Sequence, residues 1–285
     1  MLNLLIRFCV FLYTLSILSA CSSIQSIEHR VNKNLSLIKN SNFELQKHSF
    51  DEFDLISASS NRNTQLLSIY IEGDGLAWIS RYNISSNPTP INPVALKLAI
   101  IDKERFDHSI AYIGRPCQYI SQYSNNKCNS KFWSSHRFSQ DVVANFNKVI
   151  DILKIDARAE KIQLIGFSGG AAISSILAAT RNDIHSLVTV AGNLDHVSIN
   201  KFNKVSQLIH SLNAIDYSSK LKDIAQHHII GNDDDLIPES VVNNFIEKQQ
   251  GHCSKKIVAQ RVSHAYGWER FWKNSYKFKF DRCLK

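Results

Sequence analysis

The sequence has 285 residues, a formal net charge of +8 at pH 7, and 44% hydrophobic against 20% charged residues. This length suits one α/β domain with a sizeable core, and no internal repeat or second domain is evident. The basic residues are scattered, without an arginine-rich helix or an aromatic RNA-binding motif, so nucleic acid is not an expected partner.

The first twenty residues have the pattern of a secretory signal peptide. One basic residue, Arg7, precedes an almost wholly apolar stretch over residues 8–18, and small residues follow it. That stretch is too short to cross a bilayer comfortably, so it does not predict a membrane-spanning helix. We therefore predict that the chain is exported and that residues 1–20 are removed.

A cysteine at the end of this segment indicates a lipid anchor. The stretch Leu18-Ser19-Ala20-Cys21 resembles the bacterial lipobox, which implies that Cys21 is acylated and becomes the mature N-terminus. By the same resemblance, Ser22 in place of Asp implies the outer membrane, with the protein facing the periplasm or the cell surface. The alternative is an ordinary signal peptide followed by a coincidental cysteine. Residues 21–42 are polar and are expected to form a tether from the membrane.

Strands and helices alternate through the remaining domain, residues 43–285. An edge hairpin is predicted over residues 43–57, followed by strands at 66–72, 109–113, 162–165, 184–191, 227–231 and 256–262. Helices are predicted at 94–101, 137–157, 171–180, 239–249 and 266–280. This alternation predicts an α/β class with a mostly parallel, doubly wound sheet covered by helices on both faces. Residues 197–222 lack a clear strand and are expected to form a small helical insertion.

Four cysteines remain after Cys9 leaves with the signal and Cys21 takes the lipid. An even number in an exported chain predicts two disulfides, although four cysteines allow three pairings. A zinc site is not expected, because the chain has no C-x-x-C pair. We expect one disulfide to close the polar loop after the 109–113 strand and the other to tie the approach to the last strand to the C-terminal tail. These are Cys117 with Cys128 and Cys253 with Cys283.

The most specific chemical motif is Gly166-Phe167-Ser168-Gly169-Gly170, which matches G-x-S-x-G. It lies between the predicted strand 162–165 and the predicted helix 171–180, which is the context that a nucleophile elbow requires. Such a turn lifts the serine hydroxyl above the sheet, and only glycine tolerates the crowding two residues on either side. Ser168 is therefore the predicted nucleophile. The alternative is a glycine-rich turn with an incidental serine.

An acid and a base follow the serine at the ends of later strands. The run Asp233-Asp234-Asp235 comes after the 227–231 strand, and His264 comes after the last predicted strand. The order Ser, Asp, His and the elbow resemble the α/β-hydrolase superfamily over most of the chain, roughly residues 66 to 272. The resemblance implies Asp234 as the acid, because the family's acid usually lies four residues before a proline, here Pro238. The alternative for the acidic run is a polar turn with a helix cap.

The resemblance also implies an oxyanion hole of backbone N–H donors. Gly169, directly after the nucleophile, would supply the first donor. The second would come from Glu72-Gly73-Asp74-Gly75, where the superfamily often carries His-Gly-x, so that Asp74 or Gly75 donates. The sequence departs from that pattern at Glu72 and Asp74, and an aspartate beside an oxyanion is unfavourable unless its side chain turns away. The alternative for this loop is a plain turn.

Together these residues predict a serine hydrolase that cleaves carboxylic esters through an acyl-enzyme, as an esterase or lipase acting on a small-molecule or lipid ester. Asn193, Leu194 and Trp78 are expected to line the substrate pocket, while Trp268 and Trp272 are better explained by core packing. No cofactor and no metal are expected. The alternatives are a peptidase or thioesterase with the same triad, and a non-catalytic envelope lipoprotein on a hydrolase scaffold.

Overall fold

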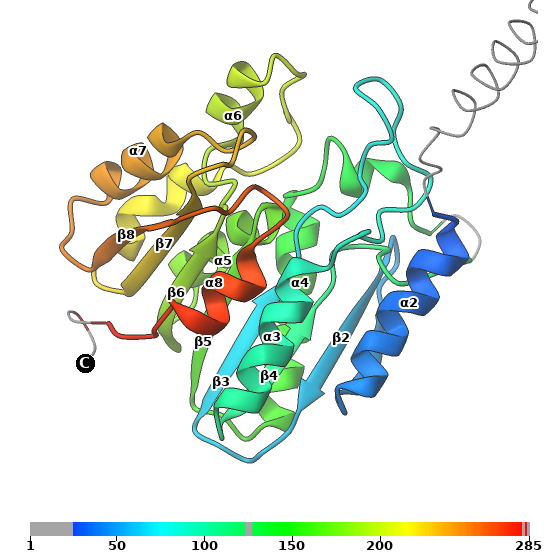
Figure 1. The fold of residues 1–285 in the computed structure, drawn as a ribbon, viewed down its shortest axis with the longest axis horizontal. Helices are drawn as coiled ribbons and strands as arrows, with labels where there is room; N and C mark the ends of the chain where they lie inside the picture. Colours follow the sequence, from blue (N-terminus) through cyan, green and yellow to red (C-terminus); the bar gives the residue numbers. More distant parts are fainter. Residues whose placement is uncertain (1–24, 123–126, 281–282, 284–285) are drawn as a thin grey trace, which may run out of the picture.

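The computed structural model describes residues 25–122, 127–280 and 283, so the predicted signal peptide and Cys21 lie outside the described residues. Its centre is an eight-stranded sheet with the order β1-β2-β4-β3-β5-β6-β7-β8. Strand β2 runs antiparallel to its neighbours β1 and β4, and the other neighbouring strands run parallel (Figure 1). The bounds are β1 (Glu44–Ser49), β2 (Asp54–Ser60), β3 (Leu66–Ile71), β4 (Ser109–Ile113), β5 (Lys161–Phe167), β6 (Ile184–Val190), β7 (Ala225–Gly231) and β8 (Ser254–Ala259).

Helices cover both faces of this sheet, as the alternation of strands and helices predicts. One apolar core contains buried residues of α4 (Gln140–Asp156), α5 (Gly169–Thr180), α7 (Glu239–Gln249) and the 3-10 helix η3 (Ala214–Leu221). The other contains buried residues of α2 (Ile27–Asn40), α3 (Val94–Arg105) and α8 (Trp268–Asn274). The central strands are buried on both sides, which is why they appear in the sequence as continuous apolar runs.

The prediction of a solvated tether is wrong for residues 27–40. They form the 14-residue helix α2, which packs on the domain through Val31 and Ile38. Two polar side chains of the same face are also buried: Arg30 donates to the carbonyl of Thr89, and Asn34 donates to that of Pro90 at 2.8 Å. The polar composition suggested a solvated segment. That expectation was wrong because these polar side chains are buried and hydrogen-bonded to the backbone of a distant loop.

The insertion at 197–222 contains the short helix α6 (His196–Phe202) and η3. Several other boundaries differ from the expectation, most of all at the C-terminal end: β8 covers residues 254–259 rather than 256–262, and α8 covers residues 268–274 rather than 266–280. The three residues after β8 form a turn whose Val262 carbonyl accepts from the Asp233 N–H. Apolar composition alone did not distinguish these turns from the regular elements.

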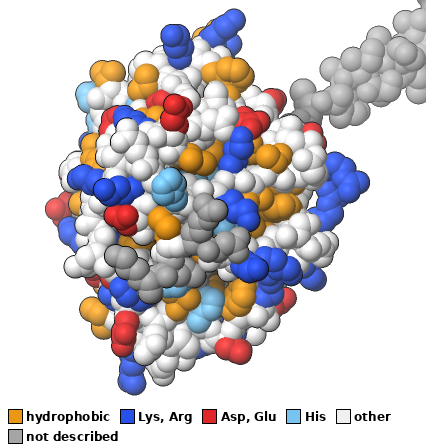
Figure 2. Space-filling model, turned by 90° about the vertical axis from the view of Figure 1, so that its left-hand side faces the viewer, with side chains coloured by type: hydrophobic (Ala, Val, Ile, Leu, Met, Phe, Trp, Pro, Cys, Tyr) orange, Lys and Arg blue, Asp and Glu red, His pale blue; other side chains and the backbone are white. Residues whose placement is uncertain are grey.

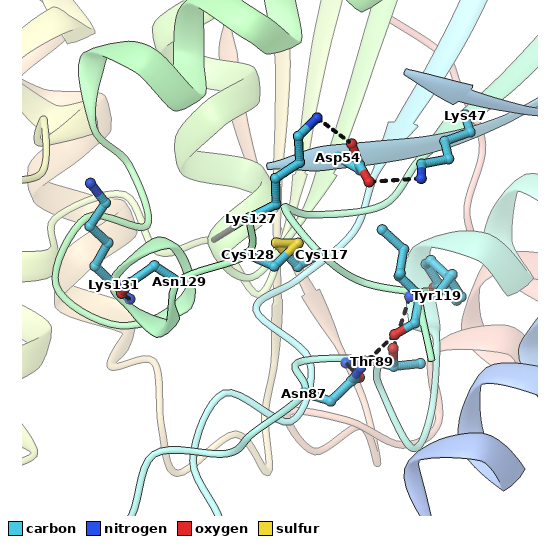
Figure 3. The surroundings of a disulfide bond; sticks show 11 residues. Lys47, Asp54, Asn87, Thr89, Cys117, Tyr119, Lys127, Cys128, Asn129 and Lys131 are labelled. Carbon is cyan, nitrogen blue, oxygen red and sulfur yellow. Dashed lines mark hydrogen bonds and ion pairs between the residues drawn. A yellow bond between two sulfur atoms is a disulfide. The ribbon is translucent and has the colours of Figure 1, made fainter. Parts of the chain in front are cut away.

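Both expected disulfides are present, Cys117–Cys128 with a Cα–Cα distance of 5.6 Å and Cys253–Cys283 with 5.5 Å. Figure 3 shows the first beside Asp54, whose carboxylate lies 2.8 Å from Nζ of Lys47 and 3.7 Å from Nζ of Lys127. The Cys117 N–H donates to the Asp54 carbonyl at 3.0 Å and the Cys128 N–H to the Glu52 carbonyl at 2.9 Å, so both ends of the disulfide-closed loop lie against the start of β2. A cross-link over 11 residues stabilises a domain by about 3 kcal/mol through the entropy of the unfolded chain.

The surface agrees with the scattered charge seen in the sequence. On the face shown in Figure 2, Lys and Arg side chains are interspersed with Asp, Glu and apolar side chains. Within the described residues, no helix combines the length and the apolar character that spanning a membrane requires.

Candidate active site

The elbow around Ser168 is built as the motif predicts. Ser168 lies between the end of β5 and the start of α5 with φ 51° and ψ −117°, a strained conformation for a residue with a side chain. A Cβ at Gly166 would lie 2.5 Å from Cα of Ala171, and one at Gly170 would collide with the carbonyl of Ile71. Glycine at both positions lets the turn close, with Gly166 against the start of α5 and Gly170 against the end of β3.

The structure brings Ser168, His264 and Asp234 together, although 96 and 30 residues separate them along the chain. Nε2 of His264 lies 3.0 Å from Oγ of Ser168, and Nδ1 lies 2.9 Å from Oδ2 of Asp234. An ionised carboxylate only accepts, so Nδ1 carries the proton and Nε2 is free to accept from the serine hydroxyl. The His264 side chain is 17% exposed and that of Asp234 is 1% exposed, so the base is reached from solvent while the acid is enclosed.

Hydrogen bonds to the backbone fix both partners of the serine. The second oxygen of Asp234 accepts from the N–H groups of Leu236 at 2.9 Å and Ile237 at 3.1 Å. Asp233 and Asp235, the neighbours of Asp234 in the chain, are exposed to solvent. The His264 carbonyl accepts from Nε1 of Trp268 at 2.8 Å, and that indole is fully buried in α8. Helix α8 therefore holds the histidine loop in place.

The loop after β3 is held by the buried carboxyl group of Glu72, which is 1% exposed. Its Oε1 accepts from the N–H of Gly73 at 2.9 Å and of Ala95 at 3.3 Å, and its Oε2 accepts from Leu96 at 3.3 Å and from the Tyr112 hydroxyl at 3.2 Å. Ala95 and Leu96 belong to the first turn of α3, whose N–H groups have no partner within the helix. Glu72, where the superfamily often has histidine, therefore fastens this loop to a helix N-terminus.

Asp74 is neutralised by two arginines. Its Oδ1 lies 2.9 Å from Nη1 of Arg115, and its Oδ2 lies 2.6 Å from Nη1 of Arg137. Burial alone would raise the pKa of Asp74, but the charges of Arg137 and Arg115 outweigh it and hold the pKa below its ordinary value. The carboxylate is thus ionised and paired at neutral pH. The unfavourable charge that the sequence suggested beside an oxyanion is compensated in this way.

Comparison with solved structures concerns the fold. The esterase Pf2001 of Pyrococcus furiosus is similar with a TM-score of 0.57 at 13% identity, over 82% of this chain and 88% of that one. Est1E of Butyrivibrio proteoclasticus, solved with ferulic acid bound, gives 0.56 at 13% over 80% and 96%. A membrane phospholipase A, described as a bacterial virulence factor, gives 0.52 at 11% over 96% and 94%. The chain has the α/β-hydrolase fold. No protein-family model and no curated protein sequence matches it.

In this α/β-hydrolase fold, the residues expected to line a pocket have different environments. Leu194 corrects the prediction, because it is fully buried in the core and does not reach a surface. Asn193 is 8% exposed, and its N–H donates to the carbonyl of Ser168 at 3.0 Å. Trp78 is 39% exposed on the loop after β3, where it pairs with Ile84. The roles of Asn193 and Trp78 in binding stay predictions.

Four residues around the site carry no motif that the sequence could reveal: Glu72 as a clamp, Arg115, Gln118 and Arg137. Arg115 and Gln118 flank Cys117, and Arg137 precedes α4, so nothing in their spacing relates them to Ser168. The partners of Arg115, Gln118 and Arg137 in the loop after β3 lie between 41 and 63 residues away in the chain. Among the residues for which positions are given, no group of three or more His, Cys, Asp or Glu side chains could hold a metal ion.

The Glu72 carboxyl group should make the α/β-hydrolase domain lose stability as the pH rises. Burial, partly opposed by its hydrogen bonds, raises its pKa from 4.5 to about 7. Below pH 4.5 the group is protonated in both the folded and the unfolded chain. Between about pH 4.5 and 7 the unfolded chain releases the proton and the folded chain keeps it, so the free energy of unfolding falls by about 3 kcal/mol.

Urea unfolding of the wild type and Glu72→Gln across pH 4 to 8 measures this effect. The stability of the variant relative to the wild type should rise by about 3 kcal/mol through that window, because glutamine does not ionise. Parallel profiles for the two proteins would show that Glu72 titrates at its ordinary pKa.

Proposed function

We propose that this protein is a serine hydrolase that cleaves carboxylic esters through an acyl-enzyme. The observation that carries the proposal is the continuous hydrogen-bonded series from Ser168 through His264 to Asp234 at the carboxyl ends of β5, β7 and β8. A nucleophile, a base and an orienting acid within hydrogen-bond distance form the arrangement that acyl transfer requires.

In acylation, His264 takes the proton of the Ser168 hydroxyl at Nε2 while Oγ attacks the ester carbon. Asp234 holds the imidazole in the required tautomer and stabilises the imidazolium that forms. The negative charge moves to the former carbonyl oxygen, where N–H groups of Gly169 and of the Gly73–Gly75 loop stabilise it. The imidazolium then protonates the leaving alcohol. A water molecule, deprotonated by His264, releases the acid in the second half of the reaction.

Esters with an apolar part fit the surroundings of the site. Exposed apolar side chains lie on three segments at this end of the sheet: Ile79 is 50% exposed, Phe202 58% and Leu236 46%. The segments are joined by hydrogen bonds, from Arg81 to the Lys204 carbonyl and from Asn203 to the Leu236 carbonyl. Figure 1 shows α6 and the loop after β3 extending from the same end of the molecule. One of the similar folds belongs to a protein named as an esterase, Pf2001, which supports ester over peptide substrates.

A fluorophosphonate probe tests the proposal directly, because it labels only an activated serine. The folded, oxidised protein should be labelled, and Ser168→Ala should not. The wild-type protein should also hydrolyse p-nitrophenyl esters of rising chain length faster than aminoacyl p-nitroanilides. Absence of labelling in the wild type would favour a non-catalytic protein on this fold, and preference for the anilides would favour a peptidase.

A further inference from the structure

The peptide between Gly73 and Asp74 is held from the side opposite Ser168. The Gly73 carbonyl accepts from Nε2 of Gln118 at 3.0 Å. The peptide is trans, so its C=O and N–H point in opposite directions, and the Asp74 N–H is directed away from Gln118. On the other side lies the nucleophile: a Cβ at Gly73 would be 3.3 Å from Cβ of Ser168, and a Cβ at Gly169 would collide with Oδ1 of Asp74.

Gln118 is itself held rigidly. It is 0% exposed, and its Oε1 accepts from the Arg115 N–H at 3.0 Å, so both ends of the amide are occupied and its orientation is defined. Arg115 contributes a second link, since its guanidinium is 2.9 Å from Oδ1 of Asp74. Residues 115–118, just after β4, thus contact both the Gly73 carbonyl and the Asp74 side chain.

The Cys117–Cys128 disulfide closes the loop that begins in this segment, and the N–H groups of both cysteines donate to backbone carbonyls at the start of β2 or just before it, those of Asp54 and Glu52. Cys117 lies between Arg115 and Gln118, and its N–H donates to the Asp54 carbonyl at 3.0 Å. The Tyr119 N–H donates to Oγ1 of Thr89 at 2.8 Å, and Figure 3 shows this bond close to the disulfide. Cys117, next to Gln118 in the chain, is thus held both by a backbone hydrogen bond and by the disulfide.

We infer that Gln118 is a positioning residue for the oxyanion hole, an inference that rests on the proposed function. Gln118 directs the Asp74 N–H at the developing oxyanion, and the Cys117–Cys128 disulfide keeps Gln118 in place. Asp74, rather than Gly75, is then the second donor. Gly75 has φ +65°, and a Cβ there would collide with the Pro88 carbonyl and lie 2.7 Å from Nε2 of Gln118, so this residue packs on the far side of the loop.

The central test compares Gln118→Leu with Gln226→Leu. Gln226 is a matched control, because it is 1% exposed and fully hydrogen-bonded near the amino end of β7, remote from Ser168. Loss of one oxyanion donor commonly lowers kcat by roughly 10² to 10³. Gln118→Leu should approach this loss in kcat with KM changed less than about threefold, because the substrate carbonyl gains its charge only in the transition state. Gln226→Leu should change kcat less than about threefold.

A trifluoromethyl ketone provides a readout that loss of stability alone does not move, because its hemiketal places an oxyanion in the hole. Its inhibition constant should rise in Gln118→Leu by about the factor by which kcat falls, and stay unchanged in Gln226→Leu. A folded Gln118→Leu with wild-type kcat and inhibition would overturn the inference. A wild type that neither hydrolyses esters nor reacts with a fluorophosphonate would instead overturn the proposed function.

The disulfides supply a second, independent pair of variants. Cys117→Ala with Cys128→Ala should lower kcat at least tenfold at a temperature where the protein stays folded, because Gln118 loses its support. Cys253→Ala with Cys283→Ala removes a cross-link at the amino end of β8 and should leave kcat within about threefold of the wild type. Equal effects of the two pairs on kcat would overturn the role of the first disulfide in positioning.

Discussion

Replacing His264 with alanine is expected to lower kcat for ester hydrolysis by roughly 10⁴ to 10⁶, with little change in KM. Its Nε2 lies 3.0 Å from the Ser168 hydroxyl, and no other side chain among the described residues is hydrogen-bonded to that hydroxyl. Ser168→Ala should cost as much, and the double variant no more than either single one, because the two residues act as a unit. Asp234→Asn should cost roughly 10⁴, because an amide favours the wrong tautomer.

Two matched controls separate these effects from general damage. His252→Ala changes an exposed histidine at the amino end of β8, and Asp235→Asn changes an exposed neighbour of Asp234. Both should retain kcat within about threefold, since surface substitutions away from the site are usually neutral. Additive losses in the Ser168 and His264 double variant would contradict the proposal that the pair works in one step.

Replacing Asp102 with alanine is expected to lower the free energy of unfolding by roughly 3–5 kcal/mol. Asp102 is 0% exposed and accepts hydrogen bonds from Tyr70, from Nε1 of Trp272 at 2.8 Å and from Nη1 of Arg105 at 3.0 Å. Alanine would leave three donors without this acceptor and a cavity in the interior. The cluster joins α3, β3 and α8, so the change should loosen the layer that holds both Glu72 and His264.

Urea unfolding with both disulfides intact measures the Asp102 effect. Asp216→Ala is the control, because Asp216 pairs with Lys248 at 3.5 Å while 65% exposed and should contribute less than about 0.5 kcal/mol. A loss below about 1 kcal/mol in Asp102→Ala would show that its partners find other acceptors. The variant should also lose kcat at a lower temperature than the wild type, since α8 carries the Trp268 indole that supports His264.

The elements of the fold follow from local patterns in the sequence. Apolar runs predict the buried strands, and recurrence at three and four residues predicts α4, because each depends on neighbours a few residues away. The elbow motif is local as well, and the crowding at Gly166 arises within its own turn, whereas the crowding at Gly170 comes from the Ile71 and Glu72 carbonyls at the end of β3. The lipid anchor at Cys21 stays a prediction, because it lies outside the described residues.

The order of the candidate catalytic residues also follows from the chain. In a parallel sheet all carboxyl ends meet at one edge, so Asp234 and His264, each after a strand, are brought to Ser168 by topology alone. The misassigned residues 27–40 show where this reasoning ends. A polar stretch can be buried if its side chains reach the backbone of a distant loop, as Arg30 and Asn34 do.

The sequence by itself predicted the fold class and the order of Ser168, Asp234 and His264 at strand ends, because order and periodicity are properties of the chain. The expected cysteine pairing was one of three that the sequence allows, and the structure shows it. Only the tertiary structure decided how the loop after β3 is held. Glu72 lies on the N-terminus of α3, Asp74 between two arginines, and Gly73 against Gln118. These contacts join segments with no common spacing or motif. Whether a buried carboxylate is unfavourable or a clamp depends on donors that only folding brings to it.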